Sequence, residues 1–255
     1  MKLNKSMKTK TTLAAIAGLA LGFSVETHAA VLVLDTGFDL NNDDSAITDT
    51  ELGNLDFTGA SKLVVTVGVK GSALSPDSQA GTVTYNGTAM TLAVGSAGGG
   101  SSYGWVGIYY LDNPGSIGVG DLVVQDPGYS LGVSALVLSG TAADFGATNS
   151  SISAATVSLT TTSAGSLVLA GYSDGSSSAV AASPLTPIFG GDIGSGKHAS
   201  GYQSVATVST INPAFTTSAA RPSTVAAEFT AAVPEPSTTA LLGLGGLALI
   251  LRRRK

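Results

Sequence analysis

Residues 171–175 read GYSDG, which matches the G-x-S-x-G nucleophile elbow of serine hydrolases with Ser173 at its centre. Asp192 and His198 follow in the chain order in which an α/β-hydrolase supplies its acid and its base. The elbow requires a strand that turns sharply into a helix, but residues 176–184 are rich in serine and end at a proline. The sequence therefore favours a loop after a strand, and a serine hydrolase is the least favoured alternative.

Residues 35–56 hold seven carboxylates and no basic side chain, which indicates either a solvated acidic loop or a calcium site. An EF-hand loop that began at Asp39 would need glycine and glutamate where the chain has Asp44 and Thr50. No EF-hand is therefore predicted. The ligands of a looser calcium site would be Asp39, Asp43, Asp44 and Asp49.

No other cofactor is predicted. The chain has no cysteine, and His198 is the only histidine after residue 30, so the usual zinc ligands are missing. In an exported protein, the absence of cysteine also means that stability comes from packing and hydrogen bonds without a disulfide framework.

Four aromatic side chains lie close together in the sequence and suggest a platform on which sugar rings could stack. They are Tyr103, Trp105, Tyr109 and Tyr110. Trp105 and Tyr109 are four residues apart and share one face of a strand, so at least one of the two strand faces is expected to be core. Carbohydrate binding is therefore the second reading of this chain.

The distribution of charge separates the body from the two ends. Residues 30–233 contain four basic and fifteen acidic side chains, a net charge of −11, while eight of the twelve basic residues lie near the termini. A body of this charge repels phosphates, which excludes nucleic acid as a partner.

Short β-branched or alternating runs recur through the body, and turn residues separate them. Examples are KLVVTVGV at 62–69, GWVGIYYL at 104–111 and GSLVLAGY at 165–172, and Asn86-Gly87 is a strong hairpin signal. The pattern predicts an all-β fold, an antiparallel β-sandwich or jelly roll, over residues 30–232. No internal repeat at a fixed period is predicted.

The first 29 residues have the layout of a secretory signal peptide. Four lysines precede an apolar stretch at 13–25, and small side chains precede a cleavage site between Ala29 and Ala30. We therefore expect an exported protein whose mature chain begins at Ala30.

The last residues form a marginal membrane span. Residues 236–251 would reach about 24 Å as a helix, less than the hydrocarbon thickness of about 30 Å. The basic side chains at 252–255 extend the reach and favour a cytoplasmic C-terminus. A permanent anchor is the alternative to a transient hold.

The order Pro234-Glu235-Pro236, apolar run, then Arg252, Arg253 and Arg254 resembles the PEP-CTERM sorting signal of exported Gram-negative bacterial proteins. The resemblance implies recognition and cleavage by an exosortase-type membrane protease, with the inner membrane as a transient station. It also implies delivery to the cell surface or to an extracellular matrix rich in exopolysaccharide, as in a biofilm. It covers the tail alone and implies nothing about the fold of the body.

Residues 82–140 also resemble a β-sandwich module of bacterial surface proteins. The resemblance rests on Val83 to Gly87, on the aromatic strand that ends at Asn113-Pro114, and on Ser139-Gly140. The sequence thus predicts a non-catalytic, exported structural protein of the surface or matrix. The alternatives are a carbohydrate-binding module and, less favoured, a serine hydrolase.

Overall fold

The computed structural model describes residues 30–41, 47–49, 55–70, 83–97, 104–118, 120–125, 130–175, 179–181, 184–193, 196–217 and 222–233. Within them lie eighteen strands and one 3₁₀ turn, η2 (Pro114–Ser116). The strands are β1 (Leu32–Asn41), β2 (Ile47–Asp49), β3 (Lys62–Lys70), β4 (Val83–Tyr85), β5 (Thr88–Ala89), β6 (Thr91–Ala97), β7 (Gly104–Asp112), β8 (Leu122–Val124), β9 (Leu131–Ser139), β10 (Thr141–Ile152), β11 (Leu159–Thr160), β12 (Ser166–Asp174), β13 (Ala179–Ala181), β14 (Thr186–Ile193), β15 (Gly196–Val205), β16 (Thr210–Ile211), β17 (Phe215–Thr217) and β18 (Ser223–Ala231).

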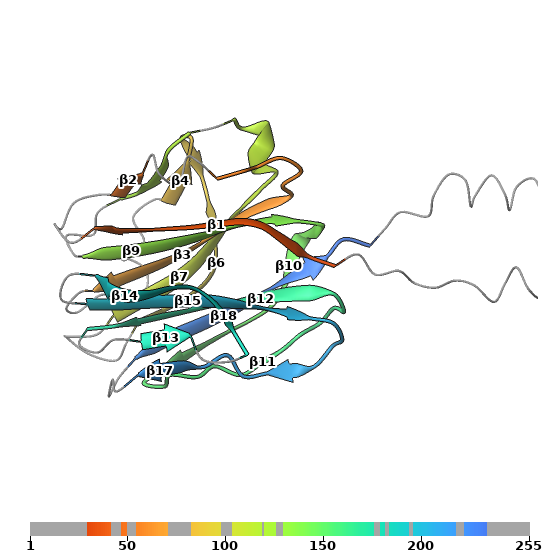
Figure 1. Cartoon of the computed structure of the whole chain (residues 1–255). Helices are drawn as coiled ribbons and strands as arrows, with labels where there is room; N and C mark the ends of the chain where they lie inside the picture. The colour runs from red at the N-terminus through yellow and green to blue at the C-terminus, as the bar shows by residue number, and fades with distance from the viewer. Residues whose placement is uncertain are drawn as a thin grey trace, which may run out of the picture.

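Two five-stranded antiparallel sheets form the centre of the fold (Figure 1). The first has the order β1-β9-β3-β7-β6 and the second has the order β10-β18-β12-β15-β14. Three small sheets accompany them, β2-β8-β4-β5 beside the first and β11-β16 and β13-β17 beside the second. The prediction of two packed antiparallel sheets is therefore confirmed.

Three apolar clusters hold these layers together. One lies between the two large sheets and includes Val64, Ile108, Leu167 and Phe229. A second joins the first large sheet to β4 and β8, and a third joins the second large sheet to β11 and β17. The central strands are thus covered on both faces, which explains why they read as almost continuous apolar runs.

The two halves of the chain have the same topology. The strands of the two large sheets correspond one to one. In order across the sheet, β1, β9, β3, β7 and β6 of the first sheet match β10, β18, β12, β15 and β14 of the second. The accompanying pairs agree as well, because β2 pairs with β8 as β11 pairs with β16, and β4 pairs with β8 as β13 pairs with β17. The repeat is therefore one of topology, and it leaves untested the prediction that no sequence repeat recurs at a fixed period.

Strand register supports the duplication in detail. Thr91 pairs with Tyr110 in the first half, and the register then shifts by one residue between β6 and β7. Thr186 pairs with Tyr202 in the second half, and the same shift follows at the same distance. β1 and β10, which also correspond, both have register shifts against their partners β9 and β18. β-Bulges are specific local features, so their agreement indicates two copies of one unit.

The two units pack in the manner of a symmetric dimer. β10 contacts β6 while β1 contacts β14, and β18 contacts β7 while β9 contacts β15. β12 contacts β7 while β3 contacts β15, and β3 and β12 contact each other. Each contact recurs with the two halves exchanged, which is the pattern of an isologous interface about a two-fold axis.

The sequence missed the repeat because strand pairing follows the alternation of apolar and polar side chains, which many residue combinations satisfy. The hairpin signal at Asn86-Gly87 was correct, since both residues have positive φ and join β4 to β5. The predicted signal peptide and the predicted C-terminal helix lie outside the described residues.

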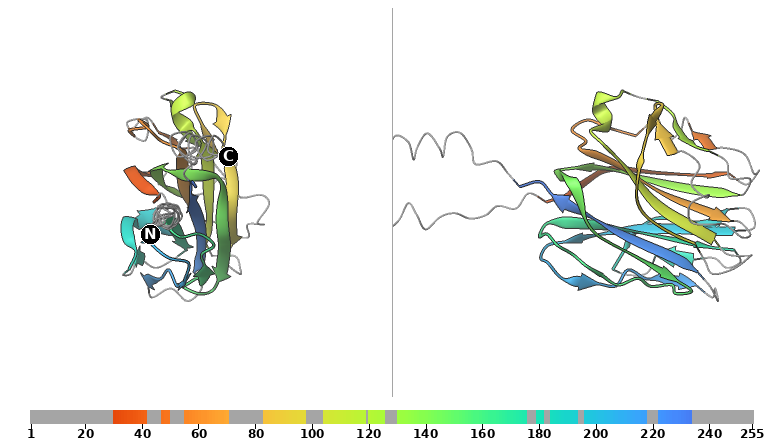
Figure 2. Two further views of the ribbon diagram at one scale, coloured as in Figure 1. Left: turned by 90° about the vertical axis from the view of Figure 1, so that its right-hand side faces the viewer. Right: turned by 180° about the vertical axis from the view of Figure 1, so that it is seen from behind.

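The first and last described residues lie at one end of the sandwich (Figures 1 and 2). The N–H of Ala232 donates to the carbonyl of Gly140 at 2.8 Å, and the N–H of Val31 donates to the carbonyl of Gly165 at 2.9 Å. Gly140, which has a φ of 70°, also lies beside the carbonyl of Ala30. Within the described part of the chain, no helix is long and apolar enough to cross a membrane.

Candidate functional site

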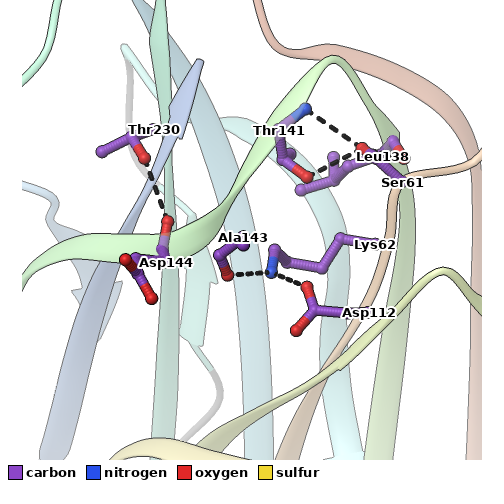
Figure 3. Close-up of polar contacts among 8 residues, drawn as sticks. All are labelled: Ser61, Lys62, Asp112, Leu138, Thr141, Ala143, Asp144 and Thr230. Atoms are coloured by element: carbon purple, nitrogen blue, oxygen red, sulfur yellow. Dashed lines mark hydrogen bonds and ion pairs between the residues drawn. The ribbon is translucent and has the colours of Figure 1, made fainter. Parts of the chain in front are cut away.

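A polar pocket of about 340 Å³ opens at this same end of the sandwich. We call it the rim pocket; it is lined by Ser61, Asp112, Asn113, Thr141, Ala142 and Ala143. Ser61 directly precedes β3, Asp112 and Asn113 lie at the end of β7, and the other three residues begin β10, so both large sheets contribute. Figure 3 shows four of the six residues, Ser61, Asp112, Thr141 and Ala143.

Lys62 lies next to the rim pocket, behind Asp112 and Ala143 of its lining. Its side chain is fully buried, and its Nζ donates to a carboxylate oxygen of Asp112 and, at 3.0 Å, to the carbonyl of Ala143 (Figure 3). The ammonium also lies 4.6 Å from the centre of the Tyr110 ring, within range of a cation–π contact. A buried ammonium needs such partners, because leaving it unpaired would cost several kcal/mol.

A hydroxyl pair fixes the first turn of the pocket wall. Ser61 Oγ lies 2.7 Å from Thr141 Oγ1 and 3.2 Å from the carbonyl of Leu138, to which it donates. The Thr141 N–H in turn donates to Ser61 Oγ at 3.0 Å. These bonds connect the residue before β3 to the end of β9 and the start of β10.

The equivalent position in the second half is closed. Counting from the paired tyrosines Tyr110 and Tyr202, Lys62 opposite Asp112 corresponds to Leu167 opposite Ser204. Leu167 is fully buried in the cluster between the large sheets, together with Val31. The same backbone thus makes an apolar contact at one site and a polar pocket with a buried charge at the other.

A second polar group lies in the middle of the sandwich, toward the other end of β3. We call it the serine–histidine cluster; it consists of Ser134, Ser173, His198 and Ser200. All four side chains are at most 1% exposed. Ser134 Oγ lies 2.6 Å from Ser200 Oγ and 3.5 Å from His198 Nε2. His198 fits there because it lies against Gly68 and Gly132, where a Cβ would collide with it.

His198 is held in its neutral form. Burial lowers its pKa to about 4, against an ordinary value of 6.5, and its bond to the Tyr172 carbonyl only partly offsets the burial. Because a carbonyl accepts, the 3.0 Å contact from Nδ1 to Tyr172 means that Nδ1 carries the proton. Nε2 then faces Ser134 as an acceptor, which is the arrangement of a general base beside a hydroxyl.

The three residues of the least favoured alternative, a serine hydrolase, do not form a triad. Ser173 lies opposite His198 on the paired strand, but its hydroxyl donates to the carbonyl of Val69 at 3.3 Å. Asp192 lies on the edge strand β14, where its side chain is 64% exposed and pairs with Lys197. Ser173 also lies within a strand, whereas an elbow needs a strand-to-helix turn.

The aromatic residues do not form an exposed platform. Trp105 and Tyr109 are 1% and 4% exposed and pack in the cluster between β7 and β8. Tyr110 is half-buried, with Lys62 against its ring and Phe145 edge-on at 5.3 Å. Tyr103 lies outside the described residues. The stacking surface proposed from the sequence is therefore corrected for the three residues that the structure describes.

The proposed calcium ligands are only partly described. Asp39 lies in β1 and Asp49 in β2, while Asp43 and Asp44 lie outside the described residues. Among the residues that the structure does place, no group of three or more acidic or histidine side chains is close enough to hold a metal ion.

Glu228 is a buried carboxylate with a structural role. It accepts hydrogen bonds from the backbone N–H groups of Ala147, Thr162 and Ser163, at 2.8 to 3.0 Å. Burial raises the pKa of Glu228, but these bonds and one from the Thr162 hydroxyl outweigh it, so the pKa lies below its ordinary value. The carboxylate thereby joins the 161–165 turn to β10 and β18.

Sequence reasoning missed the rim pocket altogether. The one signal was Lys62 itself, the first residue of the apolar run KLVVTVGV, where a lysine reads as the solvated end of a strand. Its burial depends on Tyr110 and Asp112, which lie nearly fifty residues further on and meet it only through strand pairing.

Comparison with known protein families identifies the end of the chain. Residues 232–255 match the PEP-CTERM protein-sorting motif. The match includes Pro234, Glu235, Pro236 and Arg252 to Arg254, as the sequence predicts. No curated protein is similar enough to the chain to count as a match. The motif implies an exported protein that is sorted at the membrane and processed by an exosortase.

Proposed function

We propose that this protein is a non-catalytic component of the cell surface or of an extracellular polysaccharide matrix, released to that place when an exosortase removes its C-terminal segment. The observation that carries the proposal is the junction between fold and motif. The last strand ends at Ala231 and the sorting motif begins at residue 232. A compact sandwich is thus attached directly to a sorting segment, and cleavage there would leave the body intact.

The junction also predicts how processing depends on the fold. Ala232 is bonded to Gly140, so Val233 alone separates the sandwich from Pro234. A membrane protease must accommodate several extended residues, and a folded body at this distance hinders it. Insertion of a short Gly-Ser spacer after Val233 should speed the removal of the tail, and deletion of Val233 should slow it.

Intact-mass measurement of the protein from the cell envelope and the medium tests the proposal. We expect a mature start at Ala30 and loss of the segment that follows Pro234-Glu235-Pro236. Replacement of all three of these residues by alanine, or removal of the exosortase, should leave the full tail in place and the protein in the membrane. Mature protein that still contains Arg254 and Lys255 in a strain with an active exosortase would overturn the sorting route.

The non-catalytic part of the proposal rests on the dispersal of Ser173, Asp192 and His198 and on the burial of Ser134. Short-chain p-nitrophenyl esters are the test for hydrolysis. We expect no turnover above that of buffer, with no difference among the wild type, Ser173→Ala and Ser134→Ala. Turnover that either serine variant abolishes would instead establish a hydrolase.

A further inference from the structure

We propose that the rim pocket binds the hydroxyl groups of one neutral sugar ring. The proposal rests on the proposed function, since the surrounding polysaccharide would supply the ligand. The pocket, of about 340 Å³, lies at the small end of the range for small-molecule sites. It therefore fits a single pyranose ring and not a longer segment of chain.

The two halves of the chain differ at the position of the rim pocket. The second half of the chain has Leu167 at the equivalent position, within the apolar cluster between the large sheets, which needs no buried charge. The first half instead holds Lys62 and Asp112 there, although such a pair adds little stability over apolar packing. A polar pocket that replaces a workable apolar contact on the same backbone indicates a use other than stability.

The charge of the pocket selects the class of ligand. The ammonium of Lys62 is bonded to the carboxylate of Asp112, so the two charges neutralise each other. A metal ion brought to Asp112 would meet the ammonium, and an anion brought to Lys62 would meet the carboxylate. A neutral ligand with hydroxyl groups meets neither penalty.

Two side chains of the pocket have hydrogen-bonding groups that the fold leaves unused. Asp112 uses Oδ1 for Lys62, and its Oδ2 makes no hydrogen bond within the described residues. The side-chain amide of Asn113 makes none either, although its N–H and carbonyl are both bonded. Thr141 and Ala143 also line the pocket, although the Thr141 hydroxyl and the Ala143 carbonyl each already have a hydrogen bond within the fold.

The backbone of Asn113 lies in the left-handed region. Its φ of 50° and ψ of 51° are left-handed, a conformation in which glycine would be less strained. Asparagine at the start of a helical turn ordinarily caps it, but Asn113 makes no side-chain capping bond to η2. Its amide is thus presented to the rim pocket without a task inside the fold.

The pocket offers hydrogen bonds but no open aromatic face, because Lys62 and Phe145 already occupy the ring of Tyr110. A few neutral hydrogen bonds without stacking give weak binding, with Kd on the order of millimolar per ring. Useful retention would then come from many copies acting on a repeating polymer.

The test uses the mature, processed protein and three neutral probes, the methyl α-pyranosides of glucose, galactose and mannose. In NMR titrations, at least one should shift the side-chain amide signal of Asn113 and the backbone signals of residues 141–143, with saturation in the millimolar range. Glucuronate and calcium chloride serve as charged probes and should bind more weakly. If none of the three neutral probes shifts these signals, or if a charged probe binds more tightly, the proposal is wrong.

Asn113→Gly separates binding from folding, because glycine suits the left-handed backbone and removes only the amide. We expect a fall in affinity of about 5- to 10-fold with an unchanged or raised Tm. Ser153→Gly is the matched control, since Ser153 also has positive φ but does not line the pocket. Equal affinity in wild type and Asn113→Gly would overturn the role of the pocket. That result would leave the sorting route untouched, because intact mass measures it independently.

Discussion

The two halves of the chain share strand order, pairing and bulge positions, yet they place their polar residues differently between the large sheets. In the first half Lys62 stands where the second half has Leu167. In the second half His198 stands where the first half has Val106. Lys62 is buried behind Asp112, which lines the rim pocket, whereas His198 is buried against Gly68 and Gly132.

The comparison teaches that residue type alone does not identify a site. The serine–histidine cluster has the more familiar chemistry, with a neutral imidazole facing a hydroxyl, but no part of it is accessible. The rim pocket has less reactive groups and a route to solvent. Lys62 and Gly68, which contacts His198, lie on the same face of β3 and about 20 Å apart.

The largest effect on stability is expected when Asp112 alone is replaced by its counterpart in the second half, a serine. Asp112→Ser leaves the buried ammonium of Lys62 with the Ala143 carbonyl and the Tyr110 ring alone. We expect a loss of about 4 kcal/mol in the free energy of unfolding, measured with urea. Asp192→Ser is the control, because its exposed pair with Lys197 should contribute less than about 1 kcal/mol. Equal losses in the two variants would contradict the buried-charge argument.

The next effect is a dependence of stability on pH. Because the pKa of His198 is about 4 in the fold and 6.5 ordinarily, the unfolded chain binds more protons between these values. Stability is therefore complete above about pH 6.5 and falls by about 3 kcal/mol as the pH drops to 4. Glu228, whose pKa is lowered, should add a further loss at still lower pH.

His198→Val, which copies Val106 of the first half, isolates the histidine contribution. Urea unfolding at intervals between pH 7 and pH 4 should show a nearly flat profile for this variant. The slope is the readout, so a lower stability of the variant at neutral pH does not affect the conclusion. An unchanged slope would assign the pH dependence to another group.

A smaller effect on stability should show whether Ser134 and Ser200 are coupled through their hydrogen bond. Ser134→Ala and Ser200→Ala each leave one buried hydroxyl without its 2.6 Å partner, at a cost of about 2 kcal/mol. The double variant should cost less than the sum by about 1 kcal/mol, since no hydroxyl then remains unpaired. A double-mutant cycle measured by thermal unfolding checks this, and strict additivity would show that the two serines do not interact.

The smallest change in stability is expected when Lys62 and Asp112 are both replaced by their counterparts in the second half. Lys62→Leu combined with Asp112→Ser removes both charges and restores the apolar contact seen at Leu167. The free energy of unfolding should lie within about 1 kcal/mol of the wild type, because apolar replacements of buried ion pairs are often neutral. A loss as large as that of Asp112→Ser alone would show that the two halves do not pack equivalently.

Much of the fold could be predicted from particular runs. KLVVTVGV became β3 and GSLVLAGY lies largely in β12, because β-branched and apolar side chains suit strands covered on both faces. Asn86-Gly87 formed its hairpin because both positions need positive φ. The pairing of β3 with both β7 and β9 left no comparable local signal, since each strand would suit several neighbours.

The candidate site was predicted less well. Chain order suggests Ser173, Asp192 and His198 only for the least favoured alternative, and β12, β14 and β15 place Asp192 on an exposed edge and the other two residues in the core. Trp105 and Tyr109 were placed on a strand correctly, but the small sheet that covers them could not be foreseen. Lys62 and Asn113 were overlooked, because nothing local to either residue indicates a pocket.

The sequence by itself determined the sorting motif and the all-β character of the body. Both depend on residues that are close together in the chain. The motif is one continuous segment at residues 232–255, and each strand is a short periodic run. Only the tertiary structure decided that the chain is a duplicated unit and that Lys62 and Asp112 meet at an open rim while His198 is sealed inside. The physical reason is that burial and pairing arise from residues far apart in the chain, whose contacts depend on how whole sheets pack.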